Sequence, residues 1–504
     1  MEPIRAVAIV VFTAAGATSI SCRLLRSIRC WFSRKDAPPL LPYWIPWLGH
    51  GLSYMMNARA LVDSAHKRYG SLAPFTIVLG GQTVHVVGDP THVKHVYRLN
   101  KVLTLEPVAI EIVAQFGVGI EAANTFKTTI PAEHIEGVTG ETSLSQLSHT
   151  FFREELTSRR LLDILTERYL TALDTAISGI DTRLSSNKSL ELSIWTLCRE
   201  TVFEAFVNAM YGPSLLRKHP DTFAVYNSFD EEFYKIVMQF PNGATVNVRR
   251  QRERMIDILD DYYSDSETVE ATAADFISRL HKIMARHSSM TTRQLAASQL
   301  SILWGASTNS IKVAFWALVF VCSRPLLVRQ LRDEFAPAFG SHSTPSVEYL
   351  IKSCPLFNAV YQETLRMSMA PSSMRLVEED TLIGGYTLSK GDRVLLPSMH
   401  LHRSKEFWGD DADEFRPERM LEMIERKIDV VTSGYLRPFG GGTSYCPGRF
   451  FSRGEVMSFV AVMLHHYDLE LLGSPPAPNT RPPTLGVLDP PMPCDLRVRL
   501  ATRL

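Results

Sequence analysis

The sequence has little of what marks several common classes of protein. Lysine plus arginine and aspartate plus glutamate each number 53, so the formal net charge is zero and the basic excess of nucleic-acid-binding domains is absent. No internal repeat and no Gly-Lys-Ser/Thr phosphate loop is found. Seven cysteines are spread widely, without a Cys-x-x-Cys pair or a Cys/His cluster. These absences argue against a nucleic-acid partner, a zinc site and a disulfide framework, and they indicate a reducing compartment.

What is present is a long chain with a distinct N-terminus. Hydrophobic residues make up 45% of the 504 residues, enough for a large core. Residues 6–22 carry no charge, and several arginines follow them from Arg23 onward. As a helix this run would span roughly 26 Å, and the positive charge after it keeps that end cytoplasmic. We expect a membrane anchor with its basic flank over 1–36 and a cytosolic catalytic domain over 37–504. A cleaved secretory signal is the alternative, but its charge belongs before the apolar run.

Patterning predicts a mainly α fold with a small β-rich subdomain built from both ends of the chain. A helix is expected over 59–69, followed by two strands within 72–89 joined at Gly80-Gly81. The pattern from 145 to 370 is mostly helical, strands return within 374–400, and another helix follows residue 447. Residues 118–147 are rich in glycine and threonine and are expected to form a long loop.

One predicted helix, over 292–323, has a polar centre between two apolar halves. Its middle reads Gly-Ala-Ser-Thr-Asn-Ser (305–310), which are weak helix formers. Ser307 and Thr308 could bond back to carbonyls one turn earlier, but the amide of Asn309 has more hydrogen-bonding groups than that explains. The sequence therefore favours a functional groove at this point, with Gly305 allowing close approach to the backbone.

A charged pair lies in an otherwise apolar helix. Glu363 and Arg366 are three residues apart and share a helix face, and Arg419 follows in a proline-bounded loop. A surface ion pair worth little and a buried network of one carboxylate between two guanidinium groups are both compatible with this spacing.

Three consecutive glycines precede a single cysteine in "RPFGGGTSYCPGRFF" (437–451). Pro447 suits the first position of a helix, which places Cys446 at the N-cap, where exposed N–H groups lower the pKa of a thiol. A catalytic thiol would need a nearby histidine, which the sequence does not identify. A metal held by this one thiolate, with its other ligands from a macrocycle, fits the loop well.

These features, in this order along the chain, resemble the cytochrome P450 family of haem-thiolate monooxygenases over about residues 40–504. The resemblance implies a P450 fold that binds haem b and makes Cys446 the axial ligand of the iron. It also implies roles for further residues in binding haem and in a supporting buried network: Phe439, Gly442, Gly448 and Arg375 for the former, and Glu363, Arg366 and Arg419 for the latter.

The chain departs from the family pattern at three places. The loop has Ser444 where the family usually has an arginine, so one expected partner of a haem propionate is missing. The groove helix lacks the usual acid before its threonine. No Trp-x-x-x-Arg occurs in 145–165, where Arg153, Arg159 and His149 are weak substitutes. "LWGASTNSIKVAFW" (303–316) looks most like the branch that holds sterol 7α-hydroxylases and prostacyclin synthase.

The resemblance implies activation of O2, with electrons from an NADPH-cytochrome reductase at the endoplasmic reticulum membrane. Protons would pass through Thr308, Asn309 and Ser310. The expected substrate is a lipophilic small molecule such as a terpenoid, sterol or polyketide, in secondary metabolism, bound by residues within 118–147, 226–245 and 371–374. Two alternatives are a haem-thiolate isomerase that rearranges a peroxide without reductase, with which Asn309 is compatible, and a non-catalytic haem-binding membrane protein.

Overall fold

The computed structural model describes residues 36–45, 48–131 and 140–503. The predicted anchor over 6–22 lies outside these residues. Within them, one helix, α14 (Thr292–Cys322), is long and apolar enough to cross a membrane, but 83% of its most apolar stretch is buried inside the protein. Its composition therefore reflects a place in the protein core.

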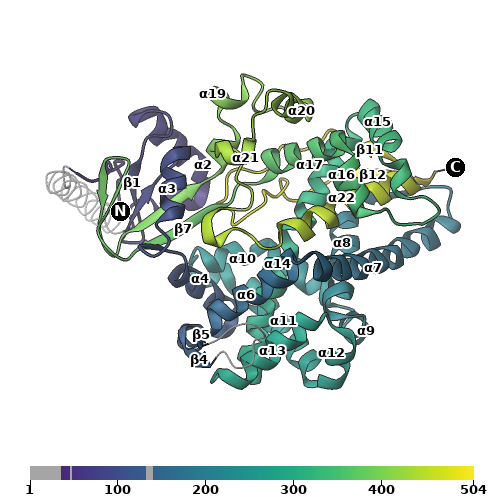
Figure 1. The fold of residues 1–504 in the computed structure, drawn as a ribbon, viewed down its shortest axis with the longest axis horizontal. Coiled ribbons are helices and arrows are strands. Elements are labelled where there is room, and N and C mark those ends of the chain that lie inside the picture. The colour runs from purple at the N-terminus through teal and green to yellow at the C-terminus, as the bar shows by residue number, and fades with distance from the viewer. Residues whose placement is uncertain (1–35, 46–47, 132–139, 504) are drawn as a thin grey trace, which may run out of the picture.

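Helices make up most of the molecule, and a sheet lies at the side where the chain begins (Figure 1). The predominantly helical pattern predicted from 145 to 370 is confirmed. The longer helices of this part, together with the helix that follows the cysteine loop, are α6 (Leu144–Thr157), α7 (Arg159–Ser185), α8 (Ile194–Tyr211), α10 (Thr222–Val237), α11 (Asn242–Ser264), α13 (Asp275–His287), α14, α15 (Pro325–Phe335), α17 (Pro355–Ser368) and α22 (Arg449–His466).

The main sheet joins strands from distant parts of the chain, as predicted. Its order is β1-β2-β10-β7-β3, in which only the β2–β10 pair is parallel. The strands are β1 (Phe75–Leu79), β2 (Gln82–Val86), β3 (Leu103–Thr104), β7 (Ser372–Val377) and β10 (Arg393–Pro397). Gly80 and Gly81 form the turn between β1 and β2 with φ of +54° and +84°, the left-handed values that a tight hairpin needs.

Smaller elements complete the fold. A second sheet has the order β11-β12-β6 and uses β6 (Leu190–Ser193), β11 (Tyr467–Leu472) and β12 (Arg497–Thr502). The hairpin of β8 (Thr381–Ile383) and β9 (Tyr386–Leu388) confirms the remaining strands expected within 374–400. The helix predicted over 59–69 is the C-terminal half of α2, which begins earlier (Gly51–Tyr69).

The loop predicted over 118–147 is wrong in its described parts. Short helical turns run from η1 (Ala114–Val118) through α5 (Ile120–Ala123) to η2 (Asn124–Lys127), and β4 (Thr129–Pro131) pairs with β5 (Glu141–Ser143). The reason is tertiary packing, which a local pattern does not contain. Val118, Ala123, Ile130 and Leu144 are buried in the main hydrophobic core, so the segment is ordered by packing on the rest of the protein.

Helix α14 runs through the protein core and positions the candidate site. It begins with a capping box in which Thr291 and Gln294 satisfy each other's backbone N–H groups, and it ends shortly before Pro325. Most of its residues are buried, yet Gly305 at its middle is exposed and Asn309 is half-buried. One face of this core helix is therefore open at the predicted groove.

Candidate functional site

The cysteine loop packs its glycines directly against helix α3 (Pro90–Arg98). Gly440 and Gly442 have φ of +76° and +65°, a conformation that side chains disfavour. A Cβ on Gly442 would lie 2.7 Å from the backbone oxygen of Tyr97. The backbone N–H of Cys446 donates to the oxygen of Phe439 at 3.1 Å, which closes the loop. The glycines therefore permit both the turns and the close approach.

The predicted N-cap position of Cys446 is wrong. Pro447 and Gly448 form a turn, and α22 begins at Arg449 with Gly448 at its N-cap. The backbone N–H groups of Gly448 and Arg449 still reach the sulfur and lower the pKa of the thiol. Burial outweighs them and raises the pKa of Cys446, opposite to the direction predicted. The loop thus holds a sulfur with amide donors in a partly desolvated place, where a bound metal cation would favour the thiolate.

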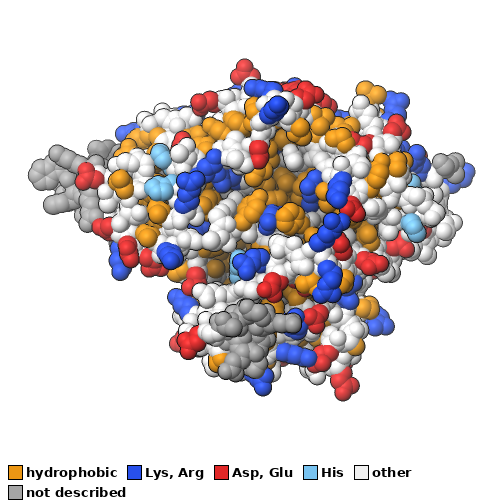
Figure 2. Space-filling view, in the orientation of Figure 1, with side chains coloured by type: hydrophobic (Ala, Val, Ile, Leu, Met, Phe, Trp, Pro, Cys, Tyr) orange, Lys and Arg blue, Asp and Glu red, His pale blue; other side chains and the backbone are white. Residues whose placement is uncertain are grey.

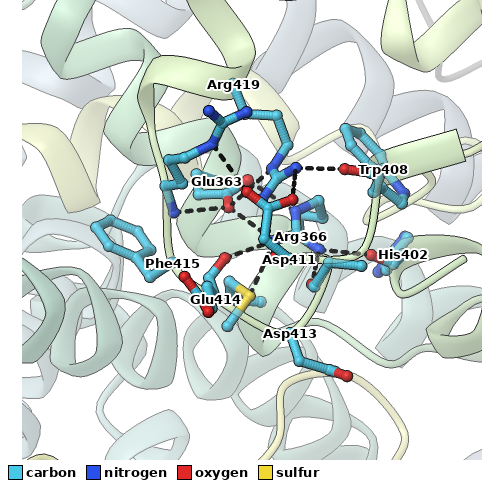
Figure 3. Close-up of polar contacts among 12 residues, drawn as sticks. Glu363, Arg366, His402, Trp408, Asp411, Asp413, Glu414, Phe415 and Arg419 are labelled. Atoms are coloured by element: carbon cyan, nitrogen blue, oxygen red, sulfur yellow. Dashed lines mark hydrogen bonds and ion pairs between the residues drawn. The ribbon is translucent and has the colours of Figure 1, made fainter. Parts of the chain in front are cut away.

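Glu363, Arg366 and Arg419 come together in a fully buried cluster (Figure 3). Arg366 binds Glu363 with two parallel hydrogen bonds of 2.7 Å each, Nε to Oε2 and Nη2 to Oε1. Nε of Arg419 lies 3.6 Å from Oε1 of the same carboxylate. Of the two arrangements that the sequence left open, the structure has the buried one.

Arg366 also connects this cluster to the loop that carries the cysteine. Its Nη1 donates to the backbone oxygens of His402 at 2.8 Å and Ala412 at 2.6 Å. His402 in turn accepts the backbone N–H of Arg437 on Nε2 at 2.9 Å, while its Nδ1 donates to the oxygen of Met369. Burial lowers the pKa of His402 to about 3, so the imidazole is neutral. The sequence pattern did not single out His402.

The polar side chains at the centre of α14 form hydrogen bonds with different parts of the protein. Ser307 bonds back to the oxygen of Leu303 at 2.7 Å, as expected for a serine in a helix. Thr308 instead donates to Asp230 of α10 at 3.1 Å. Asn309 accepts the backbone N–H of Val487 at 3.2 Å through Oδ1.

Ser310 faces the opposite side of α14. It donates to Glu455 of α22 at 2.9 Å and lies 3.0 Å from the hydroxyl of Ser452. Hydrogen bonds therefore direct Thr308, Asn309 and Ser310 to three different elements, and none joins one of the three to another within the described chain. Only Asn309, beside exposed Gly305, lies on the open face of α14.

Arg375, on β7, is 2% exposed and lies beside the cysteine loop. Its Nη1 donates to the oxygen of Leu103 at 3.2 Å and its Nη2 to the hydroxyl of Ser444 at 2.5 Å. Its Nε has no hydrogen-bond partner among the described residues. Burial lowers the pKa of this guanidinium.

The family model for Cytochrome P450 matches residues 165–498, which is most of the chain. The chain belongs to the cytochrome P450 family. Membership makes it a haem-thiolate monooxygenase, an oxidoreductase that uses protoporphyrin IX.

Curated relatives agree with this assignment across nearly the whole chain. Cytochrome P450 7B1 of Mus musculus is 23% identical and covers 88% of this chain and 86% of its own. The 7-alpha-hydroxycholest-4-en-3-one 12-alpha-hydroxylase of Homo sapiens is 25% identical over 92% of this chain and 91% of its own. The monooxygenase nodJ of Hypoxylon pulicicidum is 24% identical, with 91% and 89% covered.

A solved structure shows the same fold. The cyanobacterial CYP120A1, determined with retinoic acid, superposes with a TM-score of 0.71 at 18% sequence identity, and the match covers 93% of this chain and 99% of that one. The predicted P450 fold is thus confirmed for the body of the chain.

The residues of this P450 fit a haem group. The amide-lined sulfur of Cys446 offers an axial ligand, and the unsatisfied Nε of buried Arg375 offers a donor to a carboxylate. Gly448 lies directly against the sulfur, because a Cβ there would be 3.8 Å from Sγ. Phe439, half-buried, packs against the main core and returns its carbonyl to the N–H of Cys446.

The three substitutes considered for the missing Trp-x-x-x-Arg lie at the surface. Arg159 forms an ion pair with Glu348 at 2.8 Å, and its side chain is 75% exposed. Arg153 and His149 are exposed on α6. None of them lies in a buried position like that of Arg375.

Sequence reasoning missed a second buried charged cluster, centred on Asp230. The carboxylate of Asp230 lies 3.3 Å from Nζ of Lys312 and 3.4 Å from Nη2 of Arg199, and it accepts the indole N–H of Trp304 at 2.8 Å. Lys312 also pairs with Asp489 at 2.9 Å. The only signal in the sequence was a lysine within the apolar half of helix 292–323, which an isolated pattern cannot match with its acid on another helix.

Proposed function

We propose that this P450 inserts one oxygen atom from O2 into a lipophilic small molecule of terpenoid, sterol or polyketide type, over a catalytic domain that spans 37–504. The observation that carries the proposal is Cys446, held by backbone N–H groups in a glycine loop of a P450 fold. Bound haem supplies the activation of O2, and a thiolate ligand favours cleavage of the O–O bond.

The chain's own residues have separate tasks in this proposal. Cys446 would hold the iron, and Gly442 and Gly448 keep the loop close to its neighbours. Glu363, Arg366 and Arg419 fix the segment around His402 through the carbonyls that Arg366 binds, and His402 accepts the N–H of Arg437 at the start of the cysteine loop. These residues position the cofactor and exchange no proton with the substrate.

Of the three residues of the predicted proton path, we place Asn309 next to the reacting oxygen. Its Oδ1 accepts the N–H of Val487, and its Nδ2 donates no hydrogen bond among the described residues. A Cβ on Gly486 would lie 2.0 Å from Oδ1, so a glycine is needed for this contact. Asn309 would therefore donate hydrogen bonds to an oxygen atom on the open face of α14. Thr308 and Ser310 would act behind it, each next to a buried acid.

Aromatic side chains beside this open face support an apolar substrate. Trp304, next to Gly305, packs with ring centroids 5.6 Å from Phe116 of η1 and 5.1 Å from Phe233 of α10. Phe233 lies within the region 226–245 in which substrate contacts were expected, whereas Phe116 lies just before the region 118–147. The relatives that act on sterol skeletons and the fungal monooxygenases favour a polycyclic substrate and secondary metabolism.

Electron supply and location complete the proposal. P450 monooxygenases need a redox partner, and we assign an NADPH-cytochrome reductase to this chain. Figure 2 shows lysine and arginine side chains on both sides of the hydrophobic area at the centre of the face that carries the cysteine loop, which suits an acidic partner. The apolar run 6–22 and its basic flank support a single-pass anchor in the endoplasmic reticulum membrane.

The first test is the difference spectrum of the reduced protein with carbon monoxide. We expect the long-wavelength band of a haem-thiolate protein in the wild type and its loss in Cys446→Ala, because alanine removes the only ligand that the chain offers from this loop. A wild-type spectrum without this band would contradict the proposal and would favour a protein that binds haem in another way or not at all.

The second test separates monooxygenase from isomerase. Turnover of the accumulated precursor, identified by metabolite profiling after gene disruption, should require NADPH, reductase and O2. The donors of Asn309 are also suited to bind a peroxide, so turnover of a peroxide without reductase or O2 would favour the isomerase. Haem binding without turnover in either assay would favour the non-catalytic protein.

A further inference from the structure

Two arginines without an acidic partner flank the ring of Tyr97 beside the cysteine loop. The guanidinium carbon of Arg375 lies 4.8 Å from the ring centroid and that of Arg437 lies 5.7 Å from it. Across the residues that the structure describes, neither guanidinium forms an ion pair with a carboxylate. Two cations therefore share one aromatic ring and no anion.

Arg437 uses one of the five N–H groups of its guanidinium in a hydrogen bond within the described part of the chain. Its Nε donates to the oxygen of Gly434 at 3.1 Å, and its two terminal nitrogens have no acceptor in the described part of the chain. Burial lowers the pKa of Arg437, as it does for Arg375, which means that the surroundings disfavour the positive charge. A cation–π contact offsets only part of the cost of taking a guanidinium charge partly out of water.

Arg437 faces a cavity and the glycine loop. The cavity lies between α3, the sheet and the loop, and its lining includes Tyr97, Ser373, Gly440 and Arg437. A Cβ on Gly441 would lie 3.2 Å from Nη1 of Arg437, so the bare backbone makes room for this end of the guanidinium. The free nitrogens thus lie next to the loop that carries the cysteine, and Arg375 reaches the same loop at Ser444.

We propose that Arg437 is a second cationic contact for the carboxylates of the bound haem and acts together with Arg375. Haem carries two propionate groups, and each guanidinium can bind one carboxylate with a pair of N–H donors. This assignment neutralises both arginines and explains how the loop functions with a hydroxyl at Ser444. It rests on the proposed function, because it requires that this chain holds haem.

The test compares the rate at which the purified holoprotein loses haem to an excess of apomyoglobin. Arg437→Met removes the charge and keeps an apolar side chain of similar length, Arg437→Lys keeps the charge, and Arg426→Met removes an exposed arginine as the matched control. We expect haem loss about tenfold faster in Arg437→Met, which corresponds to about 1.4 kcal/mol, and rates within twofold of wild type in the other two.

Two further arms identify the anion. Adding Ser444→Arg to Arg437→Met should slow haem loss again, because it restores a guanidinium to the loop. The wild-type rate should not depend on phosphate concentration at constant ionic strength. If phosphate raises the thermal unfolding temperature of the holoprotein in the wild type but not in Arg437→Met, then Arg437 binds a free anion while haem is bound, which would overturn the proposal.

Other outcomes would also overturn it. A rate for Arg437→Met within twofold of the wild type would show that the arginine does not hold haem. A rate for Arg437→Lys as fast as that of the methionine variant would assign the effect to packing. If Arg437→Met accumulates without haem, the haem content of the three variants after expression gives the same comparison. Failure of the proposed function looks different, since the wild type itself would then lack the haem-thiolate spectrum.

Discussion

At the scale of single residues, the conformation of the cysteine loop requires a glycine, which has no Cβ, at position 442. Gly442 combines a positive φ with a position 2.7 Å from the backbone oxygen of Tyr97 for any added Cβ. Backbone atoms cannot move aside as flexible side chains do. The loop must therefore shift if this glycine is replaced, and it carries Cys446 with it.

We predict that Gly442→Ala weakens haem retention several-fold and lowers thermal stability by about 1–3 kcal/mol, the range of a strained backbone plus overpacking. Haem content and thermal unfolding measure the two effects. Gly391→Ala is the control, because Gly391 has a φ of +88° but no atom within 4 Å of the added Cβ. Equal behaviour of the two variants would show that contact with Tyr97 is unimportant.

Glu455 makes stability depend on pH. Its carboxyl is 2% exposed and lacks a cation, and burial raises its pKa to about 8. An acid whose pKa is higher in the folded than in the unfolded protein stabilises the fold when protonated. This contribution is lost as pH rises from the unfolded pKa, about 4.3, to about 8.

We therefore expect Glu455→Gln to unfold with a flatter dependence on pH between 5 and 8, by up to about 1.4 kcal/mol per pH unit. The amide keeps a partner for Ser310 and cannot ionise. Chemical denaturation at several pH values measures the slope. Parallel curves for variant and wild type would contradict the raised pKa.

At the scale of elements, Lys312 joins three parts of the fold that are distant in sequence. It lies on α14, pairs with Asp230 of α10 and with Asp489 of the segment before β12. Burial by itself lowers the pKa of Lys312, but the two carboxylates outweigh it and the net pKa is raised. Burial likewise raises the pKa of Asp230, and Lys312 and Arg199 outweigh it so that the net pKa is lowered. Lys312 and Asp230 therefore stabilise each other in their charged forms.

We predict that Lys312→Met lowers the free energy of unfolding by about 3–5 kcal/mol, because it leaves Asp230 buried with one cation fewer. Urea or thermal unfolding measures the change. Lys352→Met is the matched control. Lys352 pairs with Glu348 at the surface, where such a pair is worth about 0–1 kcal/mol. A similarly small loss of unfolding free energy in both variants would show that Asp230 does not need the charge of Lys312 for the fold to be stable.

The sequence predicted helices and strands that follow a local pattern better than segments whose conformation depends on tertiary packing. Local patterns predicted the long helix over 292–323, the hairpin at Gly80-Gly81 and the strands within 374–400, and the structure contains all three. The loop predicted over 118–147 was wrong because burial of its apolar residues in the main hydrophobic core orders the described parts of the segment. The start of α22 was missed because Pro447 opens a turn before the helix begins.

The same limit applies to the candidate site. Spacing placed Glu363 and Arg366 on one face, but only the fold shows that Arg366 binds carbonyls of His402 and Ala412. Ser444 was visible as a missing arginine, whereas Arg437 had no signal, since its significance depends on Tyr97 from α3. Contacts between segments that are distant in the chain cannot be predicted from a single sequence.

At the scale of the whole molecule, the sequence predicts the anchor with its basic flank over 1–36 and the catalytic domain over 37–504 as separate parts of the chain. Leu40 and Thr76 begin the pairing of the described chain with the sheet. We predict that deletion of residues 1–35 leaves haem binding and thermal stability unchanged while abolishing sedimentation with membranes. Loss of haem in the truncated protein would show that the N-terminal residues belong to the catalytic domain.

The hydrogen bonds that Arg366 donates to the segment from His402 to Glu414 have a consequence for the evolution of the sequence. The atoms that Arg366 holds in the segment from His402 to Glu414 are main-chain carbonyl oxygens, which every amino acid possesses. Two side chains of the segment are exceptions: the ring of Trp408, whose centroid lies 5.2 Å from the guanidinium carbon of Arg366, and the imidazole of His402, which accepts the N–H of Arg437. Other positions of the segment can diverge in sequence while its course is kept, and selection falls on Arg366, Glu363 and these two residues.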